Sequence, residues 1–413
     1  MLRSLTMRRQ LSATLALVAS CAAVMLACGS GSTSVIGQPT GTVGHAPTAS
    51  PTAARPPAHA LAWTQGTVAT PANIWASIND AAPAQITSAP PPDGPCLAPE
   101  TWGYPMFAPD LRHIVVPSAE CTTDSQIFGQ LYIVTVPGGA IQQVPLPAAT
   151  RVQTNVRGYG WLNSTTLFAV AWQSVTSSVV TYTLGAASTT ALPGLPSGAS
   201  NVTEAVARGN TLFYQQQDNN GVVNHRVQIH STVHRYDLNA HAVLPGSADQ
   251  GNFLMPLGSP GDLHGPGWDA APDGQHVVYQ TTTPATDQAM IGSEAMMYAS
   301  ADGSGASTIT QYMSTRSLVR ARMAPDGLHV GITEAYGTPD VLSACVNSPG
   351  QQGDPCLQFY SPDALGLPAW QWDSSHMYAA ANSGNGATVQ IYSPGHFNGA
   401  QYAANAYNPW STP

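Results

Sequence analysis

Four histidines lie close together in one part of the sequence and could in principle bind a metal ion. They are His225, His230, His234 and His241. His230 and His234 fall in a run typical of an extended strand, where four positions span roughly 13 Å. Two ligands of one ion, each about 2.1 Å from it, cannot bridge that distance. We therefore expect solvated or turn histidines here, and no bound metal.

Two carboxylates and two arginines fall at comparable places in a repeat described below. They are Arg157, Glu204, Asp269 and Arg322. We expect them to line a central channel, mainly as structural ion pairs, with Asp269 able to pair with Arg322 across its wall. A catalytic acid and base would instead require carboxyl groups roughly 5 to 9.5 Å apart beside an open pocket. Glu204 and Asp269 are the first such pair to test, but no catalytic residue is assigned.

The basic residues exclude several mechanisms. All 13 are arginines, because the sequence contains no lysine. Schiff-base chemistry and the phosphate-loop lysine are thereby ruled out, and no cofactor is expected. Without the leader described next, 10 arginines face 22 acidic residues, a net charge of −12. Nucleic acid is therefore not expected as a partner.

The first 27 residues have the pattern of a secretory signal. Arginines at positions 3, 8 and 9 precede an apolar run over residues 11–27, which passes directly into a Gly-Ser sequence. We expect this run to be cleaved and not to span a membrane. Residues 25–28, Met-Leu-Ala-Cys, resemble the lipobox of bacterial lipoproteins, which implies that Cys28 is acylated and becomes the N-terminus. Cys21 in a similar context, or an ordinary signal peptide, are the alternatives.

Four further cysteines could form disulfides in an extracytoplasmic compartment. They are Cys96, Cys121, Cys345 and Cys356. Nearest-neighbour pairing joins Cys96 to Cys121 and Cys345 to Cys356, although other pairings remain open. Neither pair has the two-residue spacing of a zinc knuckle.

The rest of the chain divides into two parts. Residues 28–57 are rich in Gly, Ser, Thr, Pro and Ala, so we expect a flexible tether that cannot bury a core. Residues 58–413 contain short β-branched and aromatic runs separated by Gly, Pro, Asn and Asp. This texture predicts an all-β domain without long helices.

A unit of about 50 residues recurs through this domain. Its clearest copies have Ala-Pro-Asp before a short apolar strand, and their aspartates are Asp110, Asp273 and Asp326. Proline presets the backbone for a turn, and Asp with Gly completes it, so we assign these aspartates to structure. Weaker copies begin near residues 161, 208 and 370. A second half with two more strands, best seen at residues 296–310, gives four strands a period.

The repeat resembles the TolB-like family, whose blade reads roughly Pro-Ala-Trp-Ser-Pro-Asp-Gly, strand, then a strand with Asp-Gly. The resemblance covers most of residues 58–413 and implies a single β-propeller, because each blade buries its faces only against its neighbours. We expect seven four-stranded blades, with six as the alternative. The stretch between Cys28 and residue 58 leaves no room for the extra α/β domain of TolB itself.

The two ends of the domain predict how the ring closes. Residues 60–64, 74–78 and 84–87 match strands two, three and four of a blade, whereas strand one has no counterpart upstream. The chain finishes Tyr407-Asn408-Pro409-Trp410-Ser411, which resembles the opening of a blade. We therefore expect residues 405–411 to pair with residues 60–65 and remove two free sheet edges.

These features favour a non-catalytic binding or scaffold propeller, lipid-anchored in the bacterial cell envelope. Its expected partner is a protein, peptide or glycan, and the membrane is expected to be contacted through the lipid alone. The alternative is an extracytoplasmic polysaccharide-acting enzyme with channel carboxylates. Peptidases that combine a propeller with a hydrolase domain need a Gly-x-Ser-x-Gly elbow, which the sequence lacks.

Overall fold

The computed structural model describes residues 58–67, 70–88, 102–119, 128–154, 156–195, 200–256, 265–284, 291–311, 318–334, 341–345, 358–359, 364–382, 387–392 and 400–412. All of them belong to a compact unit that spans Pro56–Pro413. The expected signal peptide, the acylated Cys28 and the tether lie outside the described residues. So do Cys96, Cys121 and Cys356, whereas the backbone of Cys345 is described.

Every regular element in the described ranges is a β-strand, which confirms the all-β prediction for this part of the chain. The first three antiparallel meanders contain, in chain order, β1 (Ala60–Thr67), β2 (Thr70–Ile78) and β3 (Ala84–Gln85); β4 (Met106–Phe107), β5 (His113–Ala119), β6 (Phe128–Thr135) and β7 (Ile141–Gln143); and β9 (Tyr159–Trp161), β10 (Thr166–Gln173), β11 (Thr176–Thr183) and β12 (Thr190–Ala191). A short strand, β8 (Val152–Gln153), also pairs with β6.

The remaining strands continue the same pattern. They are β13 (Ser200–Arg208), β14 (Thr211–Val223), β15 (Arg226–Asp237) and β16 (Ala242–Val243); β17 (Ala248–Pro256); β18 (Trp268–Ala270), β19 (His276–Pro284), β20 (Ile291–Ser300) and β21 (Ser307–Gln311); β22 (Val319–Met323), β23 (His329–Glu334), β24 (Val341–Cys345) and β25 (Gln358–Phe359); β26 (Ala364–Trp370), β27 (Met377–Asn382), β28 (Ala387–Tyr392) and β29 (Ala400–Ala404); and β30 (Ala406–Ser411).

The strand β17 joins two meanders into one nine-stranded sheet. It runs antiparallel to β15 and meets β19 in parallel at Gly251 and Thr282. Gly251 has a φ of +81°, and a Cβ there would collide with the carbonyl oxygen of Thr282. Glycine is therefore required where the two backbones approach each other.

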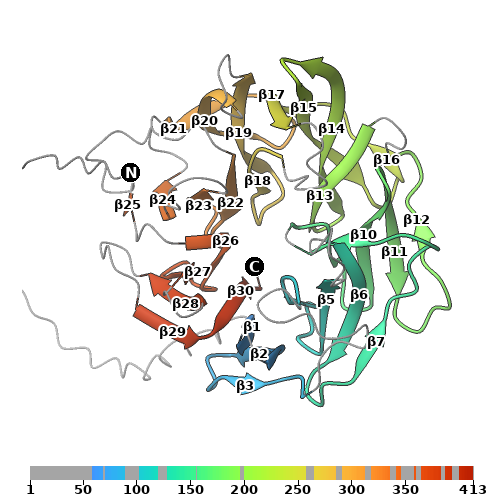
Figure 1. The fold of residues 1–413 in the computed structure, drawn as a ribbon, viewed down its shortest axis with the longest axis vertical. Coiled ribbons are helices and arrows are strands. Elements are labelled where there is room, and N and C mark those ends of the chain that lie inside the picture. The colour runs from blue at the N-terminus through green and yellow to red at the C-terminus, as the bar shows by residue number, and fades with distance from the viewer. Residues whose placement is uncertain are drawn as a thin grey trace, which may run out of the picture. The chain divides into compact units, whose positions relative to one another are not determined.

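The leading strands of the meanders contact one another in a closed order. β4 contacts β9, β9 contacts β13, and β13 contacts β18; then β18 contacts β22, β22 contacts β26, β26 contacts β30, and β30 contacts β4. Figure 1 shows those of them that it labels, β13, β18, β22, β26 and β30, set around a common centre within the unit. Their side chains can therefore meet although the residues are far apart in sequence.

The C-terminal strand completes the first sheet, in the order β3-β2-β1-β30. Leu61 is opposite Ser411, and Gln65 is opposite Ala406. Thr412 Oγ1 accepts a hydrogen bond of 3.0 Å from the Ala60 amide, and the Thr412 amide donates to the Ala60 carbonyl oxygen at 2.9 Å. The predicted pairing of residues 60–65 with residues 405–411 is confirmed.

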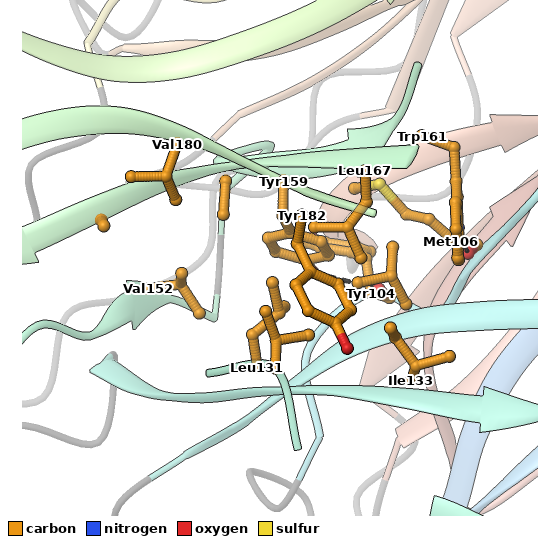
Figure 2. Packing of buried hydrophobic residues seen from close by; sticks show 14 of the residues in the cluster. Tyr104, Met106, Leu131, Ile133, Val152, Tyr159, Trp161, Leu167, Val180 and Tyr182 are labelled. Carbon is orange, nitrogen blue, oxygen red and sulfur yellow. Dashed lines mark hydrogen bonds between the residues drawn. The ribbon is translucent and has the colours of Figure 1, made fainter. Parts of the chain in front are cut away.

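Apolar side chains fill the space between successive meanders. Figure 2 shows the cluster between the second and third, where Leu131, Tyr159 and Leu167 are fully buried. Two hydrogen bonds fix β9 beside β4: the Tyr159 hydroxyl donates to the Tyr104 carbonyl oxygen, and Trp161 Nε1 donates to that of Met106, each at 3.0 Å. A fully buried side chain of this size contributes about 1.5–3 kcal/mol to stability.

The motif aspartates lie in the corners where the repeat predicts turns. Their carboxylates accept hydrogen bonds from backbone amides two residues on, at 2.9, 2.8 and 2.8 Å for Asp110, Asp273 and Asp326. Each also faces a histidine three residues on, the closest pair being Asp326 and His329 at 2.7 Å. These carboxylates hold corners of separate sheets and do not form one cluster.

Candidate functional site

The four polar residues singled out from the sequence come together inside the ring. Arg157 lies two residues before β9, Glu204 lies on β13, Asp269 on β18 and Arg322 on β22. Their exposed fractions are only 2, 6, 1 and 6%. Ionised groups this deeply buried must be paired or hydrogen-bonded, because desolvation strongly destabilises an isolated charge.

Arg157 is the centre of this group. Its Nη2 lies 3.1 Å from Glu204 Oε2, and its Nη1 lies 2.7 Å from Asp269 Oδ1. The guanidinium also donates to the carbonyl oxygen of Trp268 and lies 4.9 Å from the centre of that indole. One side chain therefore joins β9, β13 and β18.

Asp269 has both carboxylate oxygens engaged. Oδ1 accepts from the Ala270 amide at 2.9 Å and also lies 3.5 Å from Arg208 Nη2. Oδ2 accepts from the Met323 amide at 2.9 Å. The ion pair considered between Asp269 and Arg322 does not form: Asp269 pairs with Arg157, and it reaches β22 only through the Met323 backbone.

Arg322 instead turns toward the C-terminal strand. Its Nη2 donates to the Ser411 carbonyl oxygen at 2.8 Å, and its guanidinium carbon lies 3.6 Å from the centre of the Trp410 ring. Its Nη1 is buried and has no hydrogen-bond partner among the described residues. Burial lowers the pKa of Arg322 to about 9, with Asp269 opposing that shift and Arg208 and Arg157 adding to it.

Arg208 is a site residue that the sequence analysis missed. It ends β13, and its Nε and Nη1 donate to the carbonyl oxygens of Ala270 and Ala207 at 3.1 and 3.2 Å. Burial lowers its pKa, Asp269 opposes that shift, and Arg157 adds to it. The only signal was its place directly before the Gly209-Asn210 turn, where Gly209 has a φ of +56°. That signal indicates a corner and says nothing about a site.

The group therefore has more positive than negative side chains. It contains three guanidinium groups, those of Arg157, Arg208 and Arg322, and two carboxylates, those of Glu204 and Asp269. Burial lowers the pKa values of Arg208 and Arg322 because it disfavours their charged forms, and the neighbouring guanidinium groups add a smaller shift in the same direction.

A cavity of about 250 Å³ lies beside this group. Its walls come mainly from β4, β9, the end of β13 and the C-terminal segment. The lining is mostly apolar, and its charged members are Arg157 and Arg208. The remaining lining residues are Ala58, Met106, Phe107, Pro109, Leu111, Tyr159, Gly160, Trp161, Phe168, Ala205, Val206, Ala207, Trp410 and Thr412.

A buried network of glutamines fixes the segment that carries Asp269. Gln280 Oε1 accepts hydrogen bonds from the amides of Gly267 and Val319, at 3.2 and 3.0 Å. Gln215 and Gln250 both donate to the Pro266 carbonyl oxygen, at 2.8 and 2.9 Å. Satisfied buried networks of this kind restrict the backbone to one arrangement, so Asp269 is presented in a fixed position.

No protein-family profile and no curated protein sequence matches the chain. Solved structures do match. A puromycin-hydrolyzing peptidase of Mycobacterium tuberculosis is 12% identical, with a TM-score of 0.50 over 73% of this chain and 46% of its own. TolB from Acinetobacter baumannii is 11% identical, with a TM-score of 0.45 over 86% of this chain and 66% of its own. The β-propeller domain of the Trilobed protease from Pyrococcus furiosus is 10% identical, with a TM-score of 0.46 over 83% and 93%.

The fold is a β-propeller. At these identities the likeness shows the fold alone, and the chain spans less than two thirds of the peptidase and of TolB. Within the propeller, the cavity is lined by residues of the leading strands β4, β9 and β13 and of the C-terminal segment. Ligand sites in propellers and other closed folds are commonly concave and mostly apolar, with a few polar groups that fix orientation.

The histidines considered for a metal site are spread over the fourth meander. His225 and His241 occupy turns with φ of +60° and +51°. His230 Nε2 lies 3.4 Å from Asp249 on β17, whereas His234 stacks on Tyr214 at 5.4 Å. In the part of the chain that the structure describes, no three His, Cys, Asp or Glu side chains gather as a metal site. The same part contains no helix with the length and apolar character needed to cross a membrane.

Proposed function

We propose that this protein is a non-catalytic binding or scaffold propeller, whose ligand is a protein, peptide or glycan bound at the cavity beside Arg157 and Arg208. The observation that carries the proposal is the cavity itself. It combines an apolar wall with two arginines held by backbone and ion-pair contacts. Preorganised groups of this kind reduce the ordering cost of binding.

The arrangement of the carboxylates supports binding over acid-base catalysis. Glu204 and Asp269 are both paired with Arg157, and neither is among the residues that line the cavity. A general acid or base must reach the proton that it transfers. Asp269 is 1% exposed and already accepts hydrogen bonds at both oxygens.

We also propose that the propeller has seven four-stranded blades of the TolB-like type. The support is that seven leading strands, β4, β9, β13, β18, β22, β26 and β30, contact one another in cyclic order. β30 acts as the leading strand for β1, β2 and β3.

The proposed location is the outer face of a bacterial membrane, with acylated Cys28 as the anchor. The support is the lipobox-like sequence at residues 25–28 and the polar stretch that follows it. Mass spectrometry of the mature protein tests this location. We expect an N-terminal peptide that begins at Cys28 and carries acyl chains; a different N-terminus without acyl mass contradicts it.

Capture of ligands from envelope extracts tests the binding function. The bait is the intact protein, compared with Ala207→Phe, which fills the cavity, and Val175→Phe, which changes a residue that is 75% exposed. We expect one set of proteins or glycans to be retained by the wild type and Val175→Phe and lost with Ala207→Phe. Equal capture by all three baits, each with wild-type circular dichroism, would reject the cavity as the binding site.

A further inference from the structure

The cavity beside Arg208 has the features of a site for a negatively charged group. Arg208 has five N–H donors. Two of them donate to the carbonyl oxygens of Ala270 and Ala207, and a third faces Asp269 at a long 3.5 Å. Its remaining donors have no partner among the described residues. The Arg208 side chain is 15% exposed, and the residue lines the cavity.

The charge balance around the cavity points the same way. Arg157 and Arg208 share the carboxylate of Asp269, and Glu204 pairs with Arg157. The nearby Arg322 pairs with neither carboxylate, and its Nη1 has no hydrogen-bond partner in the described part of the chain. Bringing an anion to the cavity adds the missing negative charge in a region of low dielectric, where charge-assisted hydrogen bonds are strong.

The size and the remaining lining define what accompanies the anion. The volume is about 250 Å³, and the lining includes the aromatic side chains of Phe107, Trp161, Phe168 and Trp410. A cavity of this size holds a single aromatic or branched apolar group and not an extended chain. A highly charged, strongly hydrated group such as a phosphate would leave these aromatic faces uncovered.

We infer that the cavity binds a carboxylate attached to one compact apolar group, with the carboxylate against Arg208. This inference deepens the proposed function by naming the ligand chemistry, and it rests on that proposal. Two sources present this chemistry: the C-terminal residue of a peptide with an apolar side chain, and a free small carboxylic acid. Capture of C-terminal carboxylates by fixed donors is a recurring mode of peptide recognition.

Isothermal titration calorimetry on the intact protein tests the inference with neutral isosteres. The small-molecule probes are 3-phenylpropionate and its amide, and the peptide probes are N-acetyl-Ala-Ala-Phe with a free or an amidated C-terminus. We expect each acid to bind at least about tenfold more tightly than its amide, because the amide loses the charge-assisted hydrogen bond. Tighter binding of the peptide acid indicates a protein C-terminus, and tighter binding of the free acid indicates a small metabolite.

Matched variants connect this preference to the cavity. We expect Arg208→Gln to reduce the preference for acid over amide to less than about threefold, since glutamine keeps a donor but loses the charge. Ala207→Phe is expected to abolish binding of both forms, and Val175→Phe to leave it unchanged. Equal affinity for acid and amide in the wild type, or no binding of either acid, overturns the inference. Ligands captured from envelope extracts and lost with Ala207→Phe would still support the proposed function in that case.

Discussion

Arg157 and Asp269 form a buried ion pair of 2.7 Å that joins two meanders which are not neighbours in the ring. Arg157 precedes β9 and Asp269 lies on β18, while β13 contacts both strands. The pair therefore spans one whole meander, whose own carboxylate, Glu204, binds the same guanidinium. This ion pair connects the third and fifth meanders directly, whereas apolar side chains fill the space between successive meanders.

Replacing Asp269 with asparagine should strongly destabilise the propeller. The substitution leaves Arg157 with Glu204 as its one carboxylate partner among the described residues and removes the carboxylate that faces Arg208. Breaking a buried ion pair by removing one partner typically lowers the free energy of unfolding by about 3–5 kcal/mol. Urea unfolding followed by circular dichroism measures the change. Asp249→Asn, at an exposed carboxylate that faces His230, is the control and should change stability by less than about 0.5 kcal/mol. Similar midpoints for the two variants would show that the buried pair contributes little.

The corner pair of Asp326 and His329 should make stability depend on pH. Its hydrogen bond raises the pKa of His329 against the opposing effect of burial. Burial alone would raise the pKa of Asp326, but the hydrogen bonds from His329 and the Leu328 amide outweigh it and lower that pKa. The contribution of His329 to the free energy of unfolding is complete below about pH 6.5, the pKa of histidine in the unfolded chain. It is lost as pH rises through the higher pKa of His329 in the folded protein. The contribution of Asp326 to the free energy of unfolding is present above about pH 4 and is lost as pH falls through the lower pKa of Asp326 in the folded protein.

We therefore expect His329→Gln to reduce stability most between about pH 4 and 6.5, and less at pH 8. Asp326→Asn, which retains an oxygen that can accept from the Leu328 amide, completes a double-mutant cycle at each pH. The coupling between the two side chains should shrink from pH 5.5 to pH 8. A coupling that stays constant across this range would exclude ionisation of the pair as its source.

The cysteine pairing remains a prediction that peptide mapping under non-reducing conditions can decide. We expect linked peptides that contain Cys96 with Cys121 and Cys345 with Cys356. Each bond would restrain a connection within the propeller, and reduction should lower stability by about 2–4 kcal/mol for each. Recovery of free thiols from the protein isolated without reductant, or of crossed pairs, would contradict the nearest-neighbour assignment.

The repeat could be read from the sequence because its signal is local. Ala-Pro-Asp corners before apolar strands identify where β4 and β5, β18 and β19, and β22 and β23 turn, and the structure has hairpin corners at these places. The pairing of the C-terminal strand with the N-terminal strands could also be predicted from the sequence. Pro409-Trp410 resembles the start of a repeat, and the N-terminal strands lack that start. The strand β17 gives no comparable signal: Gly251 and Asn252 interrupt its apolar alternation, and its pairing with β19 depends on a backbone approach specific to glycine.

The site could be predicted only in part, because it depends on the directions of side chains across the ring. Equivalent positions in the repeat indicated Asp269 and Arg322, but the partner that each side chain reaches is set by the whole ring. Arg322 stacks on Trp410, and the ion-pair partner of Asp269 is therefore Arg157. The cavity itself depends on small residues such as Ala205 and Ala207, and their local sequence shows only that they belong to a strand.

Trp410 should contribute to stability through Arg322 as well as through the closure of the ring. Its indole covers the buried guanidinium at 3.6 Å, and its backbone lies opposite Ala62 on β1. Trp410→Ala removes a large apolar side chain and leaves Arg322 with less compensation for burial, so we expect a loss of about 3 kcal/mol. A double-mutant cycle with Arg322→Met isolates the stacking, for which a coupling of about 1–2 kcal/mol is expected.

Trp410→Phe should restore part of the loss, because a smaller aromatic face remains over the guanidinium. If the two single losses add without coupling, the stack contributes nothing and Trp410 acts through β30 alone. In that case the Trp410→Ala protein should instead aggregate as β30 detaches, because the freed edge of β1 can pair with another chain.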